Sequence, residues 1–112
     1  MKYMGSKSRI VDNILPIIQE RLRDYNIKTY IEPFCGGCNV IDKVQCDTKI
    51  ASDNHKYLIE MFKNLNQIQN LPEFITKEHY SDVRECFNKR LSTYPDWYIG
   101  AVGFLSSYNG RF

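Results

Sequence analysis

The chain has 112 residues, 43% of them hydrophobic and 25% charged, which is the composition of one small globular domain. Its formal net charge of +2 is too small to indicate a nucleic-acid partner, so a DNA-binding face would have to be a local patch. No apolar run approaches the roughly 20 residues that cross a bilayer, and residues 1–7 lack the apolar core of a signal peptide, so we expect no membrane partner and a cytoplasmic location.

The first part of the chain predicts a helix followed by a strand. Apolar residues at helical spacing predict a helix that begins near Ser8 and is capped by Ser6 or Ser8. Residues 28–32 favour extended backbone and predict a strand, which ends at Pro33 and the Gly36-Gly37 pair.

The next part predicts a short helix at 39–44, a strand at 49–52, and a helix that Asp53 or Asn54 caps and that runs to about Asn66. Strand–helix–strand units give parallel, right-handed crossovers. An independent sheet, however, usually needs three or more strands. The pattern therefore predicts an α/β chain that opens a doubly wound fold whose remaining strands lie outside these residues.

The last part predicts helices only. After a break at 70–72, Thr76 caps a helix that carries apolar residues at helical spacing. A turn at 93–96 precedes a final helix from Trp97 to Ser107.

The stretch from Tyr30 to Asp53 carries the clearest chemical signal. Glycines after a strand leave bare backbone for a ligand, and the amides at the start of the next helix favour an anionic group. Asp53 follows Gly36 by 17 positions, close to the spacing at which an acid accepts hydrogen bonds from ribose hydroxyls. The third glycine of the dinucleotide pattern is absent, which favours a ligand with one ribose and a small zwitterion, such as S-adenosylmethionine. A glycine loop that only turns the chain is the alternative.

The same turn contains Cys35 and Cys38, a CxxC that opens a predicted helix as in thioredoxin. The carboxylate of Glu32 would oppose thiolate formation there, and no later proline lies in a strand context. Zinc is disfavoured because Cys46 and Cys86 do not form a second close pair. We therefore expect reduced thiols and no metal site.

Two terminal segments give weaker signals. Residues 2–7 place a glycine between two lysines before a helix, which can bring an ammonium group and an aromatic ring to a ligand; a frayed basic terminus is the alternative. Residues 108–111 contain Asn and Arg, which read adenine and guanine edges in the major groove, although Asn-Gly also makes an ordinary tight turn.

Taken in order, these segments resemble the adenine-specific DNA methyltransferases of the Dam type, a family found in restriction-modification systems. The similar segments are Lys2-Tyr3-Met4-Gly5-Ser6-Lys7 for the N-terminal cofactor motif, Glu32-Pro33-Phe34-Cys35-Gly36-Gly37 for the glycine motif, Ser52-Asp53-Asn54 for the second-strand acid, and Phe104 to Arg111 for the start of the target-recognition region.

The resemblance implies a Rossmann-like, S-adenosylmethionine-dependent methyltransferase fold that acts on double-stranded DNA. Residues 1–70 would be the first part of the cofactor-binding domain, and residues 71–112 the helical start of the target-recognition region. The implied cofactor contacts are Tyr3, Lys7, Glu32, Phe34, Gly36 and Asp53. The implied DNA contacts are Tyr108, Asn109 and Arg111.

The family's catalytic motif, Asp-Pro-Pro-Tyr, does not occur in these residues, so we expect no catalytic residue in the chain and no methylation by it alone. The expected function is that of the N-terminal part of an adenine methyltransferase: a truncation, a fragment, or one half of an enzyme that a second chain completes. The alternatives are a non-catalytic remnant that binds cofactor or DNA weakly and, less favoured, a thioredoxin-like oxidoreductase that uses Cys35 and Cys38.

Overall fold

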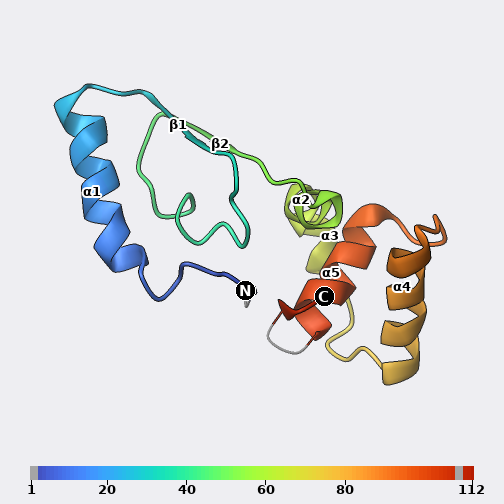
Figure 1. Cartoon of the computed structure of the whole chain (residues 1–112). Helices are drawn as coiled ribbons and strands as arrows, with labels where there is room; N and C mark the ends of the chain where they lie inside the picture. Colours follow the sequence, from blue (N-terminus) through green and yellow to red (C-terminus); the bar gives the residue numbers. More distant parts are fainter. Residues whose placement is uncertain (1–2, 108–109) are drawn as a thin grey trace. The chain divides into compact units, whose positions relative to one another are not determined.

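The computed structural model describes residues 3–107 and 110–112, which form two compact units (Figure 1). The α/β unit is Gly5–Asn54, and the helical unit is His55–Phe112 together with Tyr3 and Met4. The elements in chain order are α1 (Val11–Asp24), β1 (Thr29–Glu32), β2 (Thr48–Ala51), α2 (Lys56–Lys63), α3 (Leu65–Ile68), α4 (Lys77–Lys89) and α5 (Asp96–Ser106).

In the α/β unit, β1 and β2 pair as parallel neighbours, with Ile31 opposite Ile50. This confirms the α/β class and the two parallel strands. Helix α1 contributes Val11 and Leu22 to a small core whose other buried residues, Val40 and Val44, come from the segment between the strands. Helix α1 begins at Val11 without a side-chain cap, so the predicted cap was wrong: the Ser6 hydroxyl instead accepts the Ser8 N–H at 3.2 Å.

The helix predicted at residues 39–44 was also wrong, because the segment forms successive turns. Side chains of both strands bond this segment at Ile41. Its N–H donates to Glu32 Oε2 at 3.2 Å, and its carbonyl accepts from Lys49 Nζ at 2.9 Å. The Val44 N–H also reaches the Ile41 carbonyl, at 3.3 Å, so the segment combines side-chain contacts from both strands with short turn bonds rather than a continuous helix.

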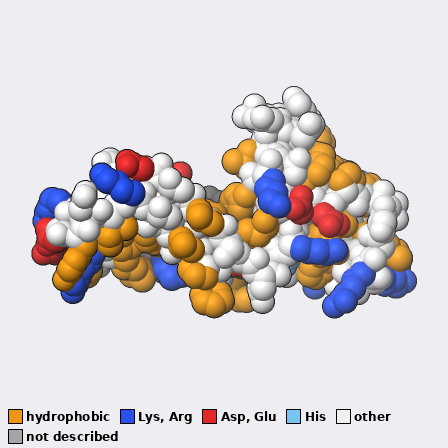
Figure 2. Space-filling model, turned by 90° about the horizontal axis from the view of Figure 1, so that it is seen from above, with side chains coloured by type: hydrophobic (Ala, Val, Ile, Leu, Met, Phe, Trp, Pro, Cys, Tyr) orange, Lys and Arg blue, Asp and Glu red, His pale blue; other side chains and the backbone are white. Residues whose placement is uncertain are grey.

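One face of the sheet is uncovered within the described residues. Ile31 is 58% exposed and Ile50 is 48% exposed, and their register places them side by side. Figure 2 shows hydrophobic side chains, in orange, on the surfaces of both units. Parallel sheets are normally covered on both faces, so this pair of strands has the surface of an incomplete sheet.

The helical unit is built on α5, which packs against both α2 and α4 (Figure 1). Its main core contains Tyr57 from α2, Val83 from α4, and Ile99 and Val102 from α5. Thr76 caps α4 as predicted, by accepting the His79 N–H at 3.1 Å.

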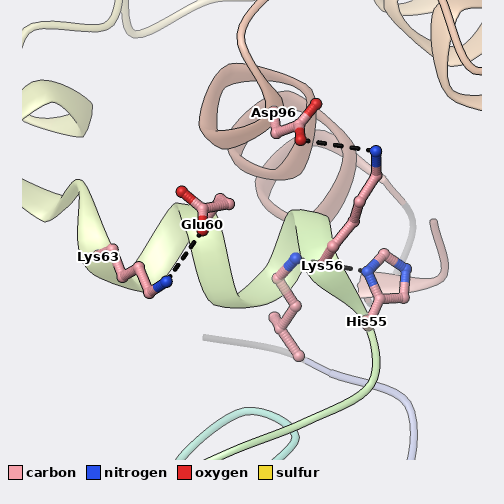
Figure 3. A network of polar contacts seen from close by, with 6 residues as sticks. His55, Lys56, Glu60, Lys63 and Asp96 are labelled. Carbon is pink, nitrogen blue, oxygen red and sulfur yellow. Dashed lines mark hydrogen bonds and ion pairs between the residues drawn. The ribbon is translucent and has the colours of Figure 1, made fainter.

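The start of α2 differs from the prediction, because its cap is His55 rather than Asp53 or Asn54. The imidazole Nδ1 of His55 accepts the Leu58 N–H at 3.4 Å (Figure 3). The helix also ends early, at Lys63, since the Asn64 side chain donates to the Glu60 carbonyl at 2.8 Å. A side-chain amide that occupies a backbone acceptor in this way competes with the helical pattern.

Two exposed ion pairs involve α2, one with α5 and one within the helix itself. Lys56 Nζ lies 3.6 Å from Asp96 Oδ2 on α5, and Lys63 Nζ lies 3.1 Å from Glu60 Oε1 (Figure 3). All four side chains are substantially exposed. Exposed pairs of this kind contribute about 0–1 kcal/mol each, so the apolar core supplies most of the unit's stability.

The two units meet in the sequence at residues 54 and 55, whereas the expected functional boundary lay at residue 70. Compact units and functional segments need not coincide, and the boundary at 70 stays a prediction. None of the helices in the described part of the chain has both the length and the apolar character that a bilayer span requires.

Candidate functional site

The glycine loop, residues 35–38, follows the carboxyl end of β1 and is bonded to the chain just beyond the carboxyl end of β2. Its tight turn is closed by the Cys38 N–H, which donates to the Cys35 carbonyl at 2.9 Å, and Gly36 has a φ of +51°. The Gly36 N–H donates to Asp53 Oδ2 at 3.0 Å. The structure thus brings together the glycine and the acid that the sequence pattern paired, and it does so through a direct hydrogen bond.

Glu32 lies at the end of β1, beside the same loop. Its Oε2 accepts the Ile41 N–H at 3.2 Å. Burial raises the pKa of the Glu32 carboxyl, while the hydrogen bond from Ile41 and the positive charge of Lys7 oppose that rise. The Lys7 ammonium is therefore close enough to act electrostatically on the strand-end carboxylate.

A small cavity lies between the N-terminal segment, residues 5–7, and the glycine loop. Its lining residues are Gly5, Ser6, Lys7, Glu32, Cys35, Gly36, Gly37, Asn39 and Val40. The cavity volume is about 10 Å³, which is room for one water. A nucleoside-sized ligand would lie along the loop rather than inside this cavity, so these residues form one wall of a site.

The predicted cofactor residues divide into two groups. Lys7, Glu32 and Gly36 line the cavity, and Asp53 is bonded to Gly36. Phe34 is 79% exposed, and Tyr3 belongs to the helical unit, where its ring centroid is 5.6 Å from that of Phe104. Contact of Phe34 or Tyr3 with a cofactor stays a prediction.

Of the predicted DNA contacts, Tyr108 and Asn109 lie outside the described residues. Arg111 is exposed. Its contact with DNA stays a prediction.

The structure adds two residues that the sequence did not predict as contacts in the site, Ser6 and Asn39. Asn39 Nδ2 donates to Ser6 Oγ at 2.6 Å, which connects the N-terminal segment to the residue that follows the CxxC turn. The only signal in the sequence was their position beside the Lys7 and Gly36 motifs, because spacing alone does not reveal a bond across 33 positions.

The surroundings of both cysteines of the turn favour the thiol over the thiolate. Burial is the main reason that the pKa of Cys35 is raised. The pKa of Cys38 is raised to about 12, first by burial and then by its hydrogen bond with the Cys35 thiol. Within the described ranges, no three His, Cys, Asp or Glu side chains gather as metal ligands would. A thioredoxin-like mechanism needs a thiolate, and this environment opposes one.

We expect iodoacetamide at pH 7.5 to modify Cys38 at least about 100-fold more slowly in the folded chain than in denaturant, because the thiolate is the reacting species. Peptide mapping by mass spectrometry measures the rate at each cysteine. The denatured chain is the matched control, since burial and the Cys35 hydrogen bond are both lost there. Equal rates in the two states would restore the redox alternative.

Comparison with known proteins gives a family match and two similar proteins. The chain matches the family described as D12 class N6 adenine-specific DNA methyltransferase over residues 3–100. The type II methyltransferase M.MjaIII of Methanocaldococcus jannaschii is 29% identical over 108 residues, which cover 80% of this chain and 37% of that protein. The modification methylase StsI of Streptococcus sanguinis is 28% identical over 125 residues, which cover 100% of this chain and 18% of that protein. The chain thus spans well under half the length of either relative. No solved structure gives a significant match.

Proposed function

Because the chain belongs to the D12 class N6 adenine-specific DNA methyltransferase family, we propose that it forms one wall of an S-adenosylmethionine site used to methylate adenine in double-stranded DNA. The family match confirms the resemblance drawn from the sequence segments. The proposal goes further than membership, since it concerns the cofactor, the residues that hold it and what these 112 residues do alone.

The observation that carries the proposal is the bond between the glycine loop and Asp53. In open α/β sheets, ligands bind beyond the carboxyl ends of the strands, where a glycine turn exposes backbone. Here the Gly36 N–H meets Asp53 Oδ2 at 3.0 Å at the ends of two parallel strands. We take this arrangement as the start of a Rossmann-like cofactor site.

The side chains along this wall suit the polar groups of the cofactor. The carboxylates of Glu32 and Asp53 are acceptors for an ammonium group and for ribose hydroxyls, respectively. The Lys7 ammonium is a partner for a carboxylate. When bound, S-adenosylmethionine supplies an electrophilic methyl group, and the protein's contribution is to hold and orient it.

We propose that the target base is bound by residues other than these 112. Methylation of an adenine amino group requires the base to leave the duplex and enter a pocket of acceptors and aromatic rings. The Asp-Pro-Pro-Tyr motif that serves this purpose in the family is absent from these residues. We therefore propose that the 112 residues bind cofactor without methylating DNA, and that further polypeptide, whether in the same chain or in a second one, is needed for transfer.

The test incubates the chain with duplex DNA and methyl-radiolabelled S-adenosylmethionine, with an active adenine methyltransferase as positive control. We expect no N6-methyladenine above background from the chain, and measurable cofactor binding by calorimetry. Methylated adenine would contradict the proposal that these 112 residues bind cofactor without methylating DNA.

A second candidate is a non-catalytic remnant that binds cofactor or DNA only weakly. The observation in its favour is the cavity of about 10 Å³, which holds no nucleoside. Absence of calorimetric binding at millimolar cofactor would support the remnant.

A further inference from the structure

The bond between Ser6 and Asn39 ties the N-terminal segment to the glycine loop within the α/β unit. Asn39 Nδ2 donates to Ser6 Oγ at 2.6 Å, and both residues are half-buried and line the small cavity. Lys7 and Gly36 line the same cavity. The bond therefore connects the two segments that form this wall, residues 5–7 and the glycine loop, which Asn39 follows.

The Ser6 hydroxyl is the acceptor in two hydrogen bonds. Its oxygen accepts from Asn39 Nδ2 at 2.6 Å and from the Ser8 N–H at 3.2 Å. A hydroxyl accepts two hydrogen bonds and donates one, so both acceptor positions are used here. What Ser6 can offer a ligand is its O–H proton, which suits an acceptor oxygen.

The positive charge of the neighbouring Lys7 favours an anionic oxygen as the acceptor for this hydroxyl. The positive charge of Lys7 acts on the Glu32 carboxylate. On the other side of Ser6, Gly5 turns the chain with a φ of +84°. A hydroxyl donor next to an ammonium group forms a charge-assisted pair of donors for a carboxylate.

We propose that Ser6 is a ligand-binding residue that donates its hydroxyl proton to the carboxylate of S-adenosylmethionine, and that Asn39 is a positioning residue that holds Ser6 and Lys7 against the glycine loop. This inference rests on the proposed cofactor site and adds the residues that recognise one end of the ligand.

Calorimetric titration of the 112-residue chain with S-adenosylmethionine tests the binding role. We expect Ser6→Ala and Asn39→Ala each to raise Kd about tenfold, since each removes or misplaces a donor to a charged group. Ser6→Thr keeps the hydroxyl and should restore most of the affinity. Ser8→Ala is the matched control, because Ser8 contributes only its backbone N–H.

Decarboxylated S-adenosylmethionine separates a direct contact from a structural role. It lacks the carboxylate, so wild type and Ser6→Ala should bind it with equal affinity. A wild-type chain that binds no S-adenosylmethionine would overturn the proposed function and this inference with it. A wild-type chain that binds, with a Ser6→Ala penalty that is absent or that persists with the decarboxylated ligand, would overturn this inference alone.

The positioning role of Asn39 has a test that needs no cofactor. Nuclear magnetic resonance titration gives the pKa of Glu32, which Lys7→Gln should raise because a nearby positive charge is lost. The same substitution should raise that pKa less in an Asn39→Ala background, where Lys7 is no longer held close. Equal rises in both backgrounds would show that Asn39 does not position Lys7.

Discussion

Asp53→Ala is expected to weaken binding of S-adenosylmethionine about 100-fold. The substitution removes the carboxylate that accepts the Gly36 N–H at 3.0 Å, and under our proposal it also removes the acceptor for a ribose hydroxyl. Hydrogen bonds to a charged group contribute about 1.5–3 kcal/mol each, and every 1.4 kcal/mol is tenfold in Kd. Calorimetry with the wild-type chain and the variant measures the difference.

Two further variants sharpen this result. Asp53→Asn keeps an acceptor oxygen for the Gly36 N–H and should lose only about tenfold. Asp47→Ala removes an exposed acid that precedes β2, at the opposite end of the strand from Asp53, and should leave Kd unchanged. Unaltered binding by Asp53→Ala would remove the central support for the cofactor site.

The second large effect concerns stability. Gly100→Ala is expected to destabilise the helical unit by about 2–3 kcal/mol, because a Cβ at this position would lie 2.1 Å from the backbone oxygen of Tyr57. The obstacle is the backbone of a packed helix, so α2 and α5 would have to separate. A loss of this size lowers Tm by roughly 10–20 °C in a domain of fewer than 100 residues.

Gly103→Ala, on the same helix, is the matched comparison. A Cβ there would meet the ring of Phe112 at 2.2 Å, so the obstacle is a side chain rather than backbone, although moving that ring disturbs its contacts with Phe87 and Phe104. Alanine also favours a helix over glycine by about 1 kcal/mol. We therefore expect a smaller loss of stability than at Gly100, about 1–2 kcal/mol. Thermal melts followed by circular dichroism compare the two variants. A Tm for Gly100→Ala that is higher than that of Gly103→Ala would contradict the close packing of α2 on α5.

Most element types followed from local sequence. The strands at Thr29–Glu32 and Thr48–Ala51 lie within one residue of the predicted spans, and the Thr76 cap was predicted correctly. These predictions succeeded because backbone propensity and side-chain caps act over a few neighbouring residues.

Two of the failed predictions involve backbone groups that side chains bond. Residues 39–44 carry a helical pattern, yet Glu32 and Lys49 bind the backbone of Ile41 from the two strands. Asn64 ends α2 early by bonding the Glu60 carbonyl. In both places side chains hydrogen-bond the backbone, and local propensity does not reveal such contacts.

For the candidate site, the sequence alone determined the family, the order of its motifs and the pairing of a glycine turn with Asp53. Spacing was enough because strand ends and turns follow from local chemistry. Only the tertiary structure decided that the Gly36 N–H donates to Asp53, that Asn39 holds Ser6, and that Phe34 is exposed. Those facts depend on where distant segments meet, and hydrogen-bond partners 17 and 33 positions apart are fixed by packing rather than by spacing.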